Sequence, residues 1–126
     1  MGVVIALKRA EQVQLDRARL RLLYRKLGED GADTVIGRAS RELSARLTRC
    51  NRLWESGDMI GLRKCARSMI AIADQAGMTH FARVACDVTA AADARDLVAL
   101  SATLARLHRV GQSSLRAVWL VRGVMV

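Results

Sequence analysis

Apolar residues recur at three- and four-residue steps in every long segment of this chain, and the chain has no proline. This spacing gathers the apolar side chains on one side of an α-helix, whereas a half-buried strand would alternate them with polar residues. A chain of 126 residues suits one domain with a single core. The sequence therefore predicts an all-α fold built from amphipathic helices.

Glycine and acidic residues interrupt the apolar pattern and predict where the helices begin and end. Gly28 and Gly77 are expected to end helices, because glycine is favoured just past a helix C-terminus. Asp58, Thr79 and Asp96 are expected to cap the following helices by accepting backbone N–H bonds. The predicted helices cover residues 3–27 (as one helix or a broken pair), 32–56, 59–76, 80–92 and a last stretch from residue 97.

The predicted loops between the last four helices are short, so neighbouring helices must run antiparallel. We therefore expect an antiparallel up-down four-helix bundle with an additional N-terminal helix. Residues 111–114 either kink the last helix or let the terminal residues fold back. The positions expected to be buried are Leu15, Leu20, Leu23, Leu27, Ile36, Leu43, Leu47, Cys50, Trp54, Leu62, Cys65, Met69, Ile72, Ala76, Phe81, Val84, Ala85, Val88, Leu97, Leu100, Leu104, Leu107 and Gly111.

The formal charge of +9 comes mostly from eighteen arginines, against three lysines. Such a chain is attracted to anionic partners, whether acidic protein surfaces, nucleic acid or lipid headgroups. Nucleic-acid binding is supported by one dense basic cluster, which consists of Arg17, Arg19, Arg21, Arg25 and Lys26. Against it, the arginines are spread over several predicted helices, aromatic residues are few, and no helix-turn-helix motif is apparent.

Three cysteines, Cys50, Cys65 and Cys86, stand far apart without a Cys-x-x-Cys pair. We expect reduced, buried thiols in a cytoplasmic protein. No apolar run approaches the ~20 residues that a membrane span needs. The apolar residues 3–7 are followed, not preceded, by Lys8 and Arg9, so no secretory signal is expected. Both apolar ends are expected to pack on the bundle or on a second copy, in a monomer or homodimer.

Residues 62–78 read LRKCARSMIAIADQAGM, with Ala66, Ser68, Met69 and Gly77 at defined spacing. This stretch resembles the signature helix of histidine-containing phosphotransfer (HPt) domains, Ala-His-x-Leu-Lys-Gly followed by Leu-Gly. The resemblance places Arg67 at the position of the phosphoacceptor histidine. The lysine and glycine positions of the family pattern are occupied by Ile70 and Ala71.

The flanking segments extend this resemblance over about residues 15–118. Residues 15–30 are similar to the leader helix of the family, and residues 42–58 to its first bundle helix with the Gly-Asp turn. Residues 80–100 are similar to the Leu-x-x-x-Cys-x-x-x-Glu stretch that follows the signature helix. The resemblance implies an HPt-like bundle in a bacterial two-component or phosphorelay pathway, with a response-regulator receiver domain or a histidine kinase as its partner.

Arginine cannot replace the phosphoacceptor histidine. A neutral imidazole is nucleophilic near pH 7, whereas a guanidinium stays protonated and has no usable lone pair. His80 and His108 are expected on other helices, away from Arg67. The sequence shows no catalytic triad, phosphate-binding glycine loop or metal-ligand cluster. We therefore expect no enzyme activity, no cofactor and no metal.

One side of the predicted helix 59–76 is the candidate partner-binding surface, formed by Arg63, Lys64, Arg67, Ile70, Ala71 and Asp74. A receiver pocket is acidic, and the forked donors of Arg67 suit carboxylates or an aspartyl phosphate. Exposed Ile70 would supply an apolar contact, with Arg63, Lys64 and Asp74 as a charged rim. Two interpretations stay open: a docking adaptor or decoy, or a decayed copy with a structural or dimerisation role.

Overall fold

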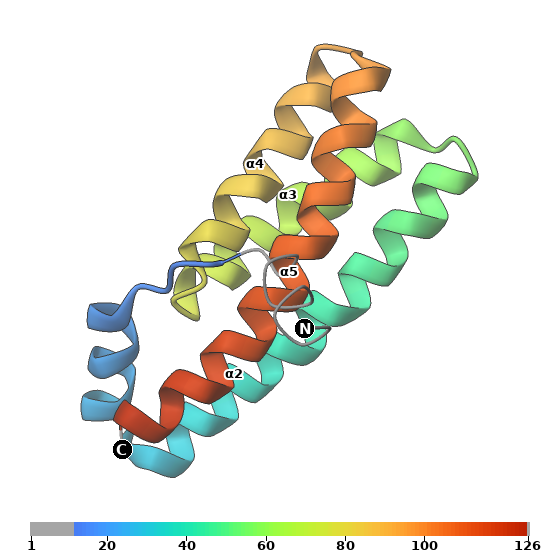
Figure 1. Cartoon of the computed structure of the whole chain (residues 1–126). Coiled ribbons are helices and arrows are strands. Elements are labelled where there is room, and N and C mark those ends of the chain that lie inside the picture. Colours follow the sequence, from blue (N-terminus) through green and yellow to red (C-terminus); the bar gives the residue numbers. More distant parts are fainter. Residues whose placement is uncertain (1–11, 126) are drawn as a thin grey trace, which may run out of the picture.

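The computed structural model describes residues 12–125 of the chain, and these residues form helices joined by short turns (Figure 1). The described part contains no strand, so the predicted all-α class is confirmed. Its helices are α2 (Arg17–Glu55), α3 (Met59–Gln75), α4 (Thr79–Asp93) and α5 (Leu97–Met125). No helix among the described residues is long and apolar enough to cross a membrane.

Helix α2 begins after Asp16, whose carboxylate accepts a hydrogen bond from the Arg19 backbone N–H at 3.0 Å. The predicted break at Gly28 is present, because this residue has φ +74° and ψ 177°. The helix resumes directly after Gly28, so the expected loop before residue 32 is a single-residue kink. The start predicted at residue 3 lies outside the described residues, and the observed helix starts at Arg17.

Three turns of three residues each, 56–58, 76–78 and 94–96, connect the helices. The first and last of these turns lie at one end of the molecule, and the second lies at the opposite ends of α3 and α4, where α2 and α5 continue past it (Figure 1). Asp58 and Asp96 cap α3 and α5 as predicted, with bonds of 2.8 and 3.0 Å from backbone N–H groups. The predicted Thr79 cap is wrong. Met78 occupies the cap position without a side-chain bond, because the turn at Gly77 buries Met78 and makes Thr79 the first helical residue.

The core lies between the four helices: α3 packs against α2 and α4, and α5 packs against α4 and α2. Residues from all four helices that were expected to be buried join one cluster, among them Cys50, Cys65, Met69, Phe81, Val84, Leu100 and Leu104. Leu27 and Leu97 are exceptions, at 48 % and 62 % exposed. Both lie at the end of a helical stretch, beside the kink or a turn, where no neighbouring helix covers them.

Helix α5 continues through residues 111–114 without a break, so the terminal residues do not fold back. Gly111 allows a close approach: a Cβ atom there would lie 2.9 Å from Leu47 Cδ1 and 3.2 Å from Phe81 Cζ. The second half of α5 runs beside α2 (Figure 1). Val118 is buried while Leu120 is exposed, so the apolar C-terminal stretch packs only partly. The apolar residues 3–7 lie outside the described part of the chain.

Candidate functional site

The solvent face of α3 carries Arg67, the residue that the sequence resemblance aligns with the phosphoacceptor histidine. The Asp58 cap and the buried residues Leu62 and Met69 set the rotation of α3, so Arg67 points away from the core. Arg67 is exposed and makes no hydrogen bond or ion pair within residues 12–125. Three further predicted site residues are exposed with it, namely Lys64, Ala71 and Asp74. These four residues form what we call the α3 face.

The remaining two predicted site residues are less accessible. The Arg63 guanidinium donates hydrogen bonds to the Asp93 carboxylate of α4, with Nη2 3.4 Å from Oδ2, and this bonding raises the pKa of Arg63. Ile70 is half-buried and packs against the core, so its expected exposure is wrong. It follows Arg63 by two helical turns, on the side of α3 that the packed bundle covers. A receiver would therefore meet the α3 face without a prominent Ile70.

Neither histidine lies on α3. His80 is half-buried in the first turn of α4, with Nε2 3.4 Å from Arg106 Nη2 of α5. His108 is half-buried on α5, and burial lowers its pKa. Its Nε2 atom is buried and has no hydrogen-bond partner within the described chain. The two imidazoles therefore belong to helices other than the one that carries Arg67.

The cysteines differ in burial. Cys50 and Cys65 are buried as expected, but Cys86 is exposed, because it lies on the outer side of α4 next to Asp87. All three thiols are free. Among the described residues, no group of three histidine, cysteine or acidic side chains is placed to hold a metal ion.

One polar network was not predicted from the sequence. Asp33 accepts two hydrogen bonds from Arg122 of α5, at 2.7 and 2.6 Å, and a third from the Tyr24 hydroxyl at 2.8 Å. These bonds join both segments of α2 to the far end of α5. The hydrogen bonds from Arg122 and Tyr24 lower the pKa of Asp33, while burial and the bond to Asp33 raise the pKa of Tyr24 to about 12. Arg122 follows Asp33 by 89 residues, so no local pattern relates them.

Replacing Asp33 with asparagine should make the fold less stable at neutral pH and remove part of its acid sensitivity. Because the pKa of Asp33 is lowered in the folded chain, its carboxylate stabilises the fold above the ordinary carboxyl pKa, and this contribution is lost as the pH falls through the lowered value. Urea unfolding from neutral to acid pH should therefore show a gap between the two proteins that closes in acid.

Asp74→Asn is the matched control, since Asp74 is exposed on α3 and has no ion pair within the described residues. A gap of constant size across the pH range, or an equal effect of the control, would contradict the role given to Asp33.

Comparison of the chain with protein-family models, with curated proteins and with solved structures finds no match.

Proposed function

We propose that this protein is a non-catalytic, HPt-like signalling adaptor or decoy that docks a receiver or kinase module without accepting phosphate. The proposal includes its architecture, an antiparallel up-down four-helix bundle with an additional N-terminal helix. One observation carries it: Arg67, at the position of the phosphoacceptor histidine in the resemblance, is exposed on α3 and has no hydrogen bond or ion pair with any of residues 12–125. The missing nucleophile argues against transfer, and the available guanidinium supports docking.

The composition of the α3 face supports an acidic partner. Lys64 and Arg67 lie three residues apart, which places two positive charges side by side on the helix surface. Small Ala71 leaves room beside Arg67 for another backbone to approach. Ile60 precedes Lys64 by one turn and is 73 % exposed, so it supplies the apolar contact that half-buried Ile70 does not. A carboxylate-lined receiver pocket with an apolar edge matches this surface.

Charge reversal tests this docking surface directly. In titrations against a panel of bacterial receiver domains, unphosphorylated and phosphorylated, Arg67→Glu should weaken binding about tenfold or more, equal to ~1.4 kcal/mol. The bundle should remain folded, because Arg67 is exposed on the outer side of α3.

Arg52→Glu is the matched control, since it makes the same charge change at an exposed arginine of α2. Arg46 is unsuitable for this purpose because its Nε donates to Ser68 of α3 at 3.0 Å. Equal losses of receiver affinity in the two variants would show that only the net charge of the protein matters. If the unmodified protein binds no receiver, docking is rejected.

A gain-of-function variant provides a second test. Arg67→His with Ala71→Gly should let the protein accept a phosphoryl group from a phosphorylated receiver, detected as acid-labile phosphate. The glycine costs roughly 1 kcal/mol of helix stability relative to alanine. Ile70→Lys is added only in a separate variant, because Ile70 packs against the core. A folded variant that neither binds a receiver nor gains phosphate would favour a decayed copy with a structural or dimerisation role.

Nucleic-acid binding is the second candidate, favoured by the first segment of α2. Its five basic residues are all exposed, namely Arg17, Arg19, Arg21, Arg25 and Lys26. Binding of this kind neutralises phosphates and releases counterions, so affinity for random duplex DNA should fall steeply with salt. Arg21→Glu with Arg25→Glu would abolish it, whereas Arg67→Glu would have a small effect. Receiver docking predicts the opposite order of the two variants.

A further inference from the structure

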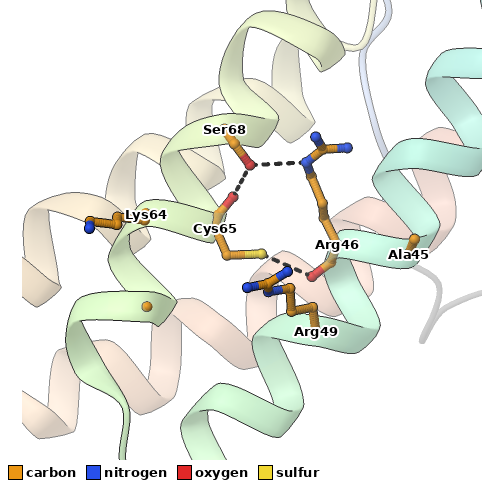
Figure 2. Close-up of a pocket in the computed structure, with 7 residues that line it drawn as sticks. Ala45, Arg46, Arg49, Lys64, Cys65 and Ser68 are labelled. Carbon is orange, nitrogen blue, oxygen red and sulfur yellow. Dashed lines mark hydrogen bonds between the residues drawn. The ribbon is translucent and has the colours of Figure 1, made fainter.

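A basic groove lies between α2 and α3, beside the α3 face. It has a volume of about 450 Å³ and includes Arg46, Arg49, Lys64, Cys65 and Ser68 among its lining residues. Figure 2 shows both arginines extending from α2 on the side that faces α3, where Cys65 and Ser68 lie. The Lys64 side chain extends away from this cluster, along the rim. No acidic or aromatic side chain is among the described residues that line the groove.

Hydrogen bonds across the groove hold Arg46 in place. The Ser68 hydroxyl donates to the Cys65 carbonyl at 2.6 Å, so its oxygen accepts the 3.0 Å bond from Arg46 Nε (Figure 2). Arg46 Nη1 lies 3.4 Å from the Glu42 carbonyl and 3.8 Å from its carboxylate. This arrangement leaves Arg46 Nη2 available to a ligand. An arginine that is already oriented loses less conformational freedom when it binds an anion.

The two other cations of the groove have no partner of their own. Arg49 and Lys64 are exposed and make no hydrogen bond or ion pair within residues 12–125. Two guanidinium groups therefore lie in the groove with a lysine at its edge, and among the described residues Glu42, which does not line the groove, forms an ion pair with one of them, Arg46. A multiply charged anion would relieve the repulsion among them.

The Cys65 thiol lines the groove and donates a hydrogen bond to the Arg46 backbone carbonyl, with Sγ 3.4 Å from the oxygen (Figure 2). A hydrogen bond from Cys50 lowers the pKa of Cys65, and the charges of Arg49 and Arg46 add smaller contributions in the same direction. Burial opposes this shift. The two guanidinium groups therefore place positive potential at the thiol, in addition to the larger effect of Cys50.

We propose that this groove binds the phosphate group of a small, soluble, non-aromatic phosphorylated molecule, held by Arg46 and Arg49 with Lys64 closing from the rim. A phosphate monoester offers several acceptor oxygens and nearly two negative charges, which match two forked donors and a mobile ammonium. The absence of an aromatic ring in the lining removes the surface on which a nucleotide base would stack. This site overlaps the α3 face only at Lys64, because Arg67 does not line the groove.

Calorimetric titrations with inorganic phosphate and with glycerol phosphate, at constant ionic strength, test the proposal. Saturable binding should fall at least tenfold in Arg49→Gln and stay unchanged in Arg52→Gln, which removes the same charge from an exposed arginine three residues later. Ser68→Ala should cause a smaller loss, because Arg46 keeps its charge but loses its orienting bond. Circular dichroism confirms that each variant is folded. Unaltered binding in Arg49→Gln, or an equal loss in Arg52→Gln, would overturn the site.

Three further ligands establish the source of the phosphate. Glycerol should not bind, and adenosine monophosphate should bind no better than glycerol phosphate. Vesicles containing phosphatidic acid present the same group on a membrane surface. If binding that depends on Arg49 is found with these vesicles and not with glycerol phosphate, the soluble ligand is rejected. Receiver docking that is intact in Arg49→Gln and lost in Arg67→Glu would show that the two sites are independent.

Discussion

Replacing Phe81 with alanine should lower the free energy of unfolding by about 3–5 kcal/mol. Phe81 is fully buried and is the largest such side chain of the core. Its ring lies against α5, close to Gly111. Alanine would leave a cavity between helices that cannot collapse without moving α5. Leu104→Ala, at another buried position, should cost about 2–5 kcal/mol. Urea unfolding followed by circular dichroism measures both losses.

Leu97→Ala is the matched control for these truncations. Leu97 has the same chemistry as Leu104 and lies on the same helix, but it is 62 % exposed. Its removal should change the free energy of unfolding by no more than about 0.5 kcal/mol. Similar losses of stability for Leu97→Ala and Leu104→Ala would contradict the orientation of α5 that buries Leu104 and exposes Leu97.

Gly77→Ala should destabilise the fold by about 2–5 kcal/mol, through backbone strain and overpacking together. Gly77 has φ +76°, a conformation that costs an alanine about 1–2 kcal/mol. A Cβ atom there would also lie 2.8 Å from Leu20 Cγ and 3.2 Å from the Asp16 carbonyl oxygen. The Gly77 carbonyl accepts a hydrogen bond from the Asp16 backbone N–H at 2.8 Å, so a shift would disturb the start of α2.

Gly57→Ala separates the two causes. Gly57 has nearly the same φ, +75°, but no atom lies within 4 Å of its hypothetical Cβ. In this variant the free energy of unfolding should fall only by the cost of the left-handed backbone conformation, about 1–2 kcal/mol. If thermal unfolding gives equal losses at the two glycines, the close contact between Gly77 and Leu20 does not contribute.

Much of the local structure could be predicted, because its causes lie within a few residues along the chain. Asp58 and Asp96 cap helices three residues before the N–H groups they bind. Gly57 and Gly77 adopt left-handed backbone conformations in the turns. The helical period placed most core residues correctly. The helical period was wrong for Leu27 and Leu97. Both lie on the apolar side of their helices, but no neighbouring helix covers them there.

In the candidate site, too, features set within one helix could be predicted and features set by the packing of two helices could not. The helical phase of α3 indicates that Arg67 points outward, because that depends only on which side of one helix is apolar. The pairing of Arg63 with Asp93 of α4 and of Arg46 with Ser68 depends on how two helices lie against each other. These contacts removed Arg63 from the open surface and made Arg46 part of a groove.

The sequence by itself determined the all-α class, most helix ends and the inward side of each helix, since these follow from short-range hydrogen bonding and a period of 3.6 residues. The tertiary structure alone decided which polar groups meet. Asp33 binds Arg122, 89 residues later, and Arg46 of α2 donates a hydrogen bond to Ser68 of α3. Such contacts depend on the rotation and sliding of packed helices, which the core sets collectively and no local spacing encodes.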